Sequence, residues 1–211
     1  MDDREKRAAL IEAMLPDVPF DGWSRGALEE AARRIGLDKA ELGSLFPGGP
    51  RDLVAGFSRW ADRSMLAALA EKGLETMKMH ERISLAVRTR LSLLEPHREA
   101  VRRALALLAL PQHLALGLRL LYDTVDAVWY AAGDTATDFT YFTKRGLLAG
   151  VLAATTLYWL DDRSPGGAET EAFLERRLAG IMALPKFGAR LRQGVERLPN
   201  PFRLMRIGRR H

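Results

Sequence analysis

Apolar residues recur at intervals of three and four along almost the whole chain, the spacing that lines one face of an α-helix. We find no segment in which apolar and polar residues alternate over the length of a strand between hairpin turns. The pattern therefore predicts an all-α fold. Prolines, glycines and capping residues divide it into helices at about residues 4–15, 25–36, 38–45, 50–73, 79–93, 96–110, 111–132, 138–160, 169–184 and 185–198.

The first 49 residues contain three short predicted helices separated by tight turns, the layout of a helix-turn-helix unit. A turn that reads FPGGPRDLV, residues 46–54, leads from this unit into a long helix. In this layout the segment 23–57 resembles the TetR family of one-component repressors. That resemblance implies a TetR-like fold, in which residues 1–49 precede a larger helical ligand-binding domain, here residues 50–184.

The segment at the position of a recognition helix, residues 37–46, is poorly suited to DNA. It carries Asp38 and Glu41 against Lys39 alone, whereas contacts to DNA phosphates need several cations. We therefore expect an inherited three-helix unit with no specific DNA binding. A ligand-responsive repressor of the TetR type remains the alternative function.

Charge is distributed unevenly along the 211 residues, although the net charge is only +5. Residues 185–211 hold eight Lys and Arg against one Glu, which leaves 24 basic and 26 acidic residues in the rest of the chain. The protein is therefore expected to be a nearly neutral globule with a basic tail, and the tail is expected to meet an anionic partner.

Apolar side chains alternate with cations in this tail at helical spacing, the pattern of an amphipathic helix that lies on a membrane surface. An anionic membrane is the expected partner, while nucleic acid, or packing of the tail on the acidic body, are the alternatives. The residues expected to contact the membrane are Phe187, Arg190, Leu191, Val195, Leu198, Phe202 and Met205.

The location of the protein is also suggested by the sequence. The N-terminus begins with acidic residues and lacks an apolar signal core. The longest uncharged run, residues 146–160, is 15 residues long and would span about 22 Å as a helix, less than the hydrocarbon core of a bilayer. We expect a cytoplasmic protein that associates peripherally with the inner face of the membrane.

The segment 124–150 concentrates aromatic, acidic and basic residues at a predicted corner between two helices. Together with HREAVRRALALLAL at 97–110, it resembles the lipid-binding accessory proteins of coenzyme Q biosynthesis, a TetR-like family that assists the demethoxyubiquinone hydroxylase. The residues that carry this resemblance most specifically are Ala132, Gly133, Asp134, Thr137, Asp138, Phe139, Thr143, Lys144 and Arg145.

The resemblance implies roles for several residues of this motif. Arg145 is expected to meet a lipid head group, and Tyr141 and Phe142 are expected to dock the hydroxylase, with Asp138 and Lys144 beside them. Ala136, Thr140, Tyr141 and Phe142 stand where the family usually has Ser, Asn, Trp and Tyr, so the largest aromatic anchor is missing.

The residues themselves support this interpretation only in part. Tyr141 and Arg145 are four positions apart on one helix face, which places a planar cation beside an aromatic ring. The alternative is that Asp138 caps the helix and that the aromatic residues fill core space.

Small residues alternate with bulky ones over 100–132 and 146–156, which allows either close helix packing or an apolar cavity. A tunnel for an isoprenoid tail is the more specific hypothesis. The residues expected to line it are Trp129, Tyr130, Leu148, Leu152 and Trp159.

Catalytic motifs are absent from the sequence. No histidine follows a glutamate by three residues, as a di-iron bundle requires, and the motifs of metalloproteases, serine hydrolases and phosphate-binding loops are missing. The chain has no cysteine, which excludes thiol catalysis and cysteine-bound zinc. Asp123 and Asp126 share a helix face and could act as an acid and a base, or pair with a nearby arginine such as Arg119.

We therefore expect a non-enzymatic protein without cofactor or metal. It would bind an isoprenoid quinone or a phospholipid and present a quinone intermediate to the demethoxyubiquinone hydroxylase at an anionic membrane surface. By analogy with TetR-like folds we also expect a homodimer.

Overall fold

The computed structural model describes residues 2–133 and 140–181, and side chains of the second range from Lys144 onward. Every regular element in these ranges is a helix, which confirms the all-α prediction. The α-helices are α1 (Asp3–Met14), α2 (Val18–Asp21), α3 (Arg25–Ile35), α4 (Lys39–Leu45), α5 (Pro50–Ala70), α6 (Met79–Leu94), α7 (Arg98–Leu108), α8 (Leu114–Ala132) and α9 (Thr140–Asp161). Short 3₁₀ turns lie at Leu74–Thr76, Glu95–His97, Pro111–His113 and Pro165–Gly167, and residues 168–181 are helical.

Helix ends follow from local chemistry. The Ser24 hydroxyl accepts a hydrogen bond from the Ala27 N–H and caps α3, which ends at Gly36 with φ of 73°. Asp38 caps α4 by accepting from the Ala40 N–H, and Glu41 pairs with Lys6 of α1.

Two helix starts and one short helix differ most from the sequence prediction. Pro96 and Pro111 lie in 3₁₀ turns, so α7 and α8 begin at Arg98 and Leu114, two or three residues later than expected. Helix α2 was not predicted, because its four residues are too few to show a helical period.

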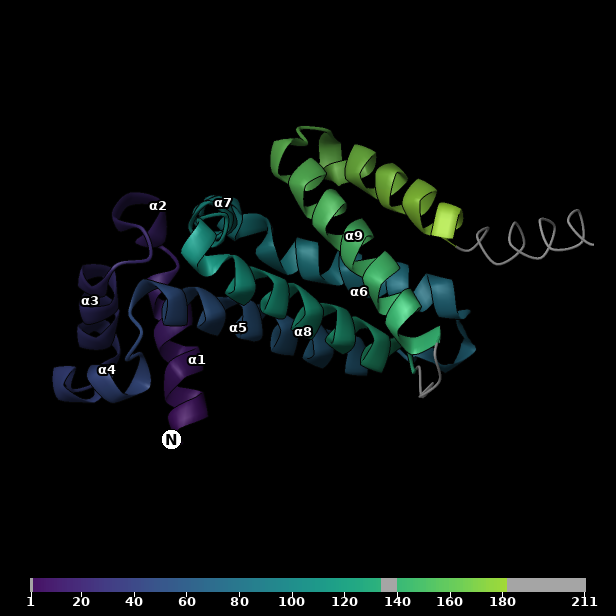
Figure 1. Ribbon diagram of the computed structural model, residues 1–211. Helices are drawn as coiled ribbons and strands as arrows, with labels where there is room; N and C mark the ends of the chain where they lie inside the picture. Colours follow the sequence, from purple (N-terminus) through teal and green to yellow (C-terminus); the bar gives the residue numbers. More distant parts are fainter. Residues whose placement is uncertain (1, 134–139, 182–211) are drawn as a thin grey trace, which may run out of the picture.

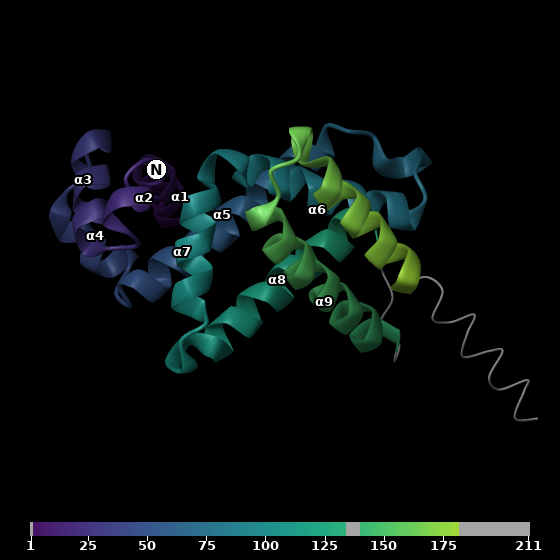
Figure 2. The same cartoon turned by 90° about the horizontal axis from the view of Figure 1, so that it is seen from above.

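The long helices α5, α6, α8 and α9 pack on one another, and α1, α3 and α4 gather at one end of α5 (Figures 1 and 2). The N-terminal helices are also tied to α7, because Trp23 Nε1 donates to the Ala100 carbonyl at 3.1 Å and Arg103 Nη2 donates to the Pro19 carbonyl at 2.7 Å. One continuous apolar core runs from α1 to the helical segment 168–181. The division at residue 49 therefore remains an interpretation.

The helical segment 168–181 follows a turn organised by Asp162. Its carboxylate accepts hydrogen bonds from the Ser164 N–H at 2.7 Å and from the Thr170 N–H at 2.9 Å. Hydrogen bonds from the side chains of Ser164 and Thr170, and after them the bonds from the two N–H groups, hold the pKa of Asp162 well below its usual range. The turn thus fixes where the segment starts, beside α6 and α9 (Figure 1).

No single helix of the described ranges has both the length and the apolar character needed to cross a membrane. One bent pair, Met79–Leu108 with Pro111–Ala132, meets these criteria only when its two arms are taken together, and they meet at 98°. The seven residues expected to bind the membrane lie outside the described residues.

Candidate functional site

An apolar cavity of about 360 Å³ lies between α5, α6, α7, α8 and α9. Small side chains on three helices leave this space open among the surrounding leucines. The lining residues include Phe57, Leu94, Val101, Ala104, Leu105, Leu108, Ala109, Leu114, Gly117, Leu118, Leu121, Leu152, Ala153 and Leu157. A cavity of this size and character suits an apolar ligand better than water.

The cavity has an apolar rim. Leu114, Leu118 and Leu157 line it, yet they are 54%, 60% and 60% exposed to solvent. Large apolar side chains grouped at the edge of a pocket commonly mark a binding or membrane-contacting surface. An apolar molecule could therefore reach the cavity over a continuous apolar path.

A polar network borders the cavity. Arg90 Nε donates to Asp62 Oδ1 at 2.9 Å, and the Thr124 hydroxyl lies 3.1 Å from both carboxylate oxygens of Asp62. The Arg90 and Asp62 side chains are each only 11% exposed. Arg90 and Thr124 line the cavity and, with the hydroxyl-bearing Ser58 and Thr156, bring hydrogen-bonding groups to a mostly apolar wall.

Sequence reasoning missed this network. Its members lie on α5, α6 and α8, separated by 28 and 62 residues, so no local spacing reveals it. The sequence contained one signal of this network: α5 has an aspartate among the residues that it buries in the core.

Arg145 lies in a different place, between α8 and α9. Its Nε and Nη2 approach Asp126 Oδ1 at 3.0 and 2.8 Å, and its side chain is 6% exposed. Asp126 therefore pairs with Arg145 of the next helix, a partner that the sequence pattern did not indicate. Beside this pair, Lys144 Nζ lies 5.7 Å from the centre of the Trp129 ring. Both contacts fasten α9 to α8.

The residues expected to line a tunnel occupy several environments. Leu152 lies in the wall of the apolar cavity. Leu148 and Trp129 are buried in the core outside that wall, and Tyr130 is 77% exposed on the surface of α8. Asp138 lies outside the described residues, as do the side chains of Tyr141 and Phe142.

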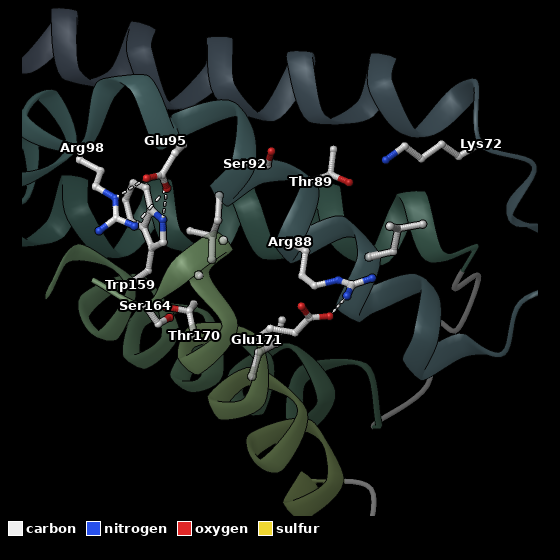
Figure 3. A pocket seen from close by; sticks show the side chains of 15 residues that line it. Lys72, Arg88, Thr89, Ser92, Glu95, Arg98, Trp159, Ser164, Thr170 and Glu171 are labelled. Atoms are coloured by element: carbon white, nitrogen blue, oxygen red, sulfur yellow. Dashed lines mark hydrogen bonds and ion pairs between the residues drawn. The ribbon is translucent and has the colours of Figure 1, made fainter. Parts of the chain in front are cut away.

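Trp159 borders a second, polar cleft of about 540 Å³ between α6, the end of α9 and the helical segment 168–181 (Figure 3). Its Nε1 donates to Glu95 Oε2 at 2.8 Å, and the Arg98 guanidinium lies 4.8 Å from the ring centre. Figure 3 also shows Arg88 paired with Glu171 across the cleft. These charges largely neutralise one another, so the cleft offers little net charge to a ligand.

Metal chemistry has no support in residues 2–133 and 140–181, where no three His, Asp or Glu side chains are grouped as metal ligands. The strongest candidate in this part of the chain is therefore the apolar cavity with its polar network.

Comparison with known proteins gives consistent matches. Residues 114–185 match the COQ9 family model, and this range supplies α8 and α9 of the cavity wall. The ubiquinone biosynthesis protein COQ9 of Rattus norvegicus, a mitochondrial protein, is 34% identical over 180 residues, which are 82% of this chain and 57% of that protein. The Homo sapiens protein is 34% identical over 82% of this chain and 56% of its own length, and the Drosophila melanogaster protein is 35% identical over 82% and 54%.

The chain thus spans a little more than half the length of the curated relatives that it matches. Among solved structures, a TetR transcriptional regulator from Nitrosomonas europaea matches with a TM-score of 0.66 and 21% identity, over 82% of this chain and 96% of that one. At this identity the likeness shows the fold alone, and it confirms the predicted TetR-like fold. With relatives of 31% to 35% identity and the family-model match, the chain belongs to the COQ9 family of ubiquinone biosynthesis proteins.

Proposed function

We propose that this protein is a non-enzymatic, lipid-binding accessory protein of ubiquinone biosynthesis. It takes an isoprenoid quinone intermediate from the membrane and presents it to the demethoxyubiquinone hydroxylase. The observation that carries the proposal is the apolar cavity between α5 and α9, with its exposed leucine rim and the polar network of Arg90 and Thr124 at its border.

The chemistry of this cavity fits a quinone with an isoprenoid tail. The leucine and alanine walls match the branched hydrocarbon chain, whose transfer from water is favourable in proportion to the apolar area buried. A quinone ring carries carbonyl oxygens that accept hydrogen bonds. Arg90 has more N–H groups than its bond to Asp62 uses, and it is the donor that we assign to the ring.

Membrane contact involves two parts of the chain in this proposal. The exposed rim leucines Leu114, Leu118 and Leu157 face the apolar layer, so that a lipid can enter the cavity without crossing water. The basic tail from residue 185 binds the anionic surface, in line with its surplus of seven positive charges. We also assign a homodimer, by analogy with TetR-like folds.

Docking of the hydroxylase is assigned to the start of α9, with Tyr141, Phe142 and Lys144. Arg145 acts there as a positioning residue, because its guanidinium is buried against Asp126 and holds α9 on α8. A charge reversal at Arg145 would place two carboxylates together and loosen this helix pair. Arg145 therefore affects the lipid through the position of α9.

A TetR-type repressor is the second candidate, favoured by the three-helix unit and by the likeness to the Nitrosomonas europaea regulator. The charges of α4 argue against it. Lys39 Nζ lies 2.7 Å from Glu29 Oε2, so the single lysine of the recognition segment is already paired. Phosphate contacts would have to come from elsewhere.

Extraction of the purified protein tests the lipid-carrier proposal. Protein prepared without detergent and extracted with organic solvent is expected to release a lipid or quinone with a long apolar tail, detected by mass spectrometry. The cavity would otherwise hold water against leucine walls, which is unfavourable. Recovery of no apolar ligand from repeated preparations, and no uptake when quinone is added, would contradict the proposal.

A further inference from the structure

A further cleft, of about 330 Å³, lies between α1 and α5, away from the apolar cavity and from the polar cleft beside Trp159. Four arginines line it, Arg4 and Arg7 from α1 and Arg59 and Arg63 from α5. Residues three or four positions apart share one face of a helix, so each helix presents its pair to the other. Gly56 lets the helices approach, because a Cβ there would lie 3.1 Å from the Phe46 ring and 3.2 Å from Ile11 Cδ1.

These arginines have no acidic partner among the described residues. Asp3 is the only acid lining the cleft in that part of the chain, and it forms no ion pair with any of them. The Nε of Arg7 is buried without a hydrogen-bond partner. Two nearby cations differ in this respect. Lys6 of α1 pairs with Glu41, and Arg90 of α6 pairs with Asp62 of α5.

Such an arrangement is unfavourable for an empty protein, although water weakens the repulsion because Arg4, Arg59 and Arg63 are exposed at the mouth of the cleft. Arginine stays charged at any physiological pH, so these guanidinium groups repel one another. Partial loss of solvent lowers the pKa of Arg63, and the charges of Arg4 and Arg59 lower it further, while the charge of Asp62 acts in the opposite direction. The four positive charges therefore lie near one another around a cleft that leaves room for a small ion.

We propose that the cleft formed by Arg4, Arg7, Arg59 and Arg63 binds a phosphate group. Guanidinium groups form paired hydrogen bonds with phosphate oxygens, and four of them can surround a tetrahedral anion. A doubly charged phosphate would also neutralise more of the repulsion than a carboxylate or chloride ion. The site is independent of the proposed lipid cavity. The phosphate can belong to a free anion or to a lipid head group.

The first test measures the thermal midpoint of the full chain in sodium phosphate or pyrophosphate against sodium chloride at equal ionic strength. Phosphate is expected to raise the midpoint by roughly 5–10 °C once its concentration exceeds the dissociation constant about a hundredfold. Arg59→Gln with Arg63→Gln should lose most of this rise. Its midpoint in chloride should be no lower than that of the unmodified protein, since repulsion is relieved.

Arg119→Gln is the matched control, because Arg119 is an exposed arginine of α8 outside both the cleft and the lining of the apolar cavity. It should keep the full response to phosphate. Should the double variant fold poorly, Arg59→Gln and Arg63→Gln are measured singly by calorimetric titration with pyrophosphate. An equal rise in all variants would overturn the proposal, because it would reflect a general salt effect.

Vesicles distinguish the source of the phosphate. If binding to phosphatidylglycerol vesicles weakens more in the double variant Arg59→Gln with Arg63→Gln than in Arg119→Gln, the site binds a lipid head group. If only free phosphate shows a dependence on these arginines, the site binds a soluble anion. The proposal fails when neither probe depends on these arginines. Tight duplex DNA binding that the double variant loses would also overturn it, in favour of a nucleic-acid backbone.

Discussion

Replacement of Arg90 by alanine is expected to lower the free energy of unfolding by about 3–5 kcal/mol, the usual cost of breaking a buried ion pair by removing one partner. The Asp62 side chain, 11% exposed beside Arg90, would keep the Thr124 hydroxyl as its remaining hydrogen-bond partner of this network. A carboxylate in this largely buried position then loses most of the interaction that offsets the cost of its desolvation. Urea unfolding of the purified variant, followed by circular dichroism, measures this loss.

Two further variants show whether the pair acts as described. Thr124→Val removes one hydroxyl and should cost less, about 1–3 kcal/mol. Asp62→Leu combined with Arg90→Leu removes both charges and should recover most of the stability that Arg90→Ala loses. A loss below about 1 kcal/mol in Arg90→Ala would mean that water reaches the pair, since exposed ion pairs contribute that little.

Filling the apolar cavity is expected to reduce ubiquinone production in cells and to cause several-fold accumulation of the demethoxy precursor. Ala153 lines the cavity from α9, so Ala153→Phe places a ring where the isoprenoid tail is proposed to lie. The residues that would dock the hydroxylase are unchanged. Quinone analysis by liquid chromatography of cells that depend on the variant measures the effect.

Ala154→Phe is the matched control, because Ala154 is the next residue of α9 and lies outside the cavity wall. The comparison is informative when both variants melt close to the unmodified protein, since overpacking a core can cost about 1–3 kcal/mol. Normal quinone levels in cells with a stable Ala153→Phe protein would show that the function does not depend on the cavity. Equal defects in both variants would point to a general packing effect.

The sequence was a good guide to the fold because helix ends depend on neighbouring residues. Ser24, Gly36 and Asp38 end or begin helices within one residue of the predicted positions, since each acts on its own backbone. The helix starts predicted at Pro96 and Pro111 were early by two or three residues, because a proline fits a 3₁₀ turn as well as the first turn of an α-helix.

The candidate site was predicted less well, because it depends on contacts between distant segments. Leu152 was expected in the cavity wall and lies there, whereas Tyr130 is turned to solvent by its position on the outer face of α8. Small-residue spacing allowed either close packing or a cavity on α7 to α9, and it contained no information on which helix faces would enclose a cavity. The pairing of Asp126 with Arg145 joins two helices across a corner, which local spacing does not show.

The measurement that tests the central claim most directly is photolabelling of the purified full chain with a photoreactive isoprenoid quinone, followed by mass spectrometry of peptides. We predict labels on the segments that line the apolar cavity, residues 54–58, 104–121 and 152–157, and we predict that unlabelled quinone competes with them. Ala153→Phe should lose most of this labelling and Ala154→Phe should keep it. Labels confined to the polar cleft of Figure 3 or spread over the surface, without competition, would contradict the assignment of the cavity as the quinone site.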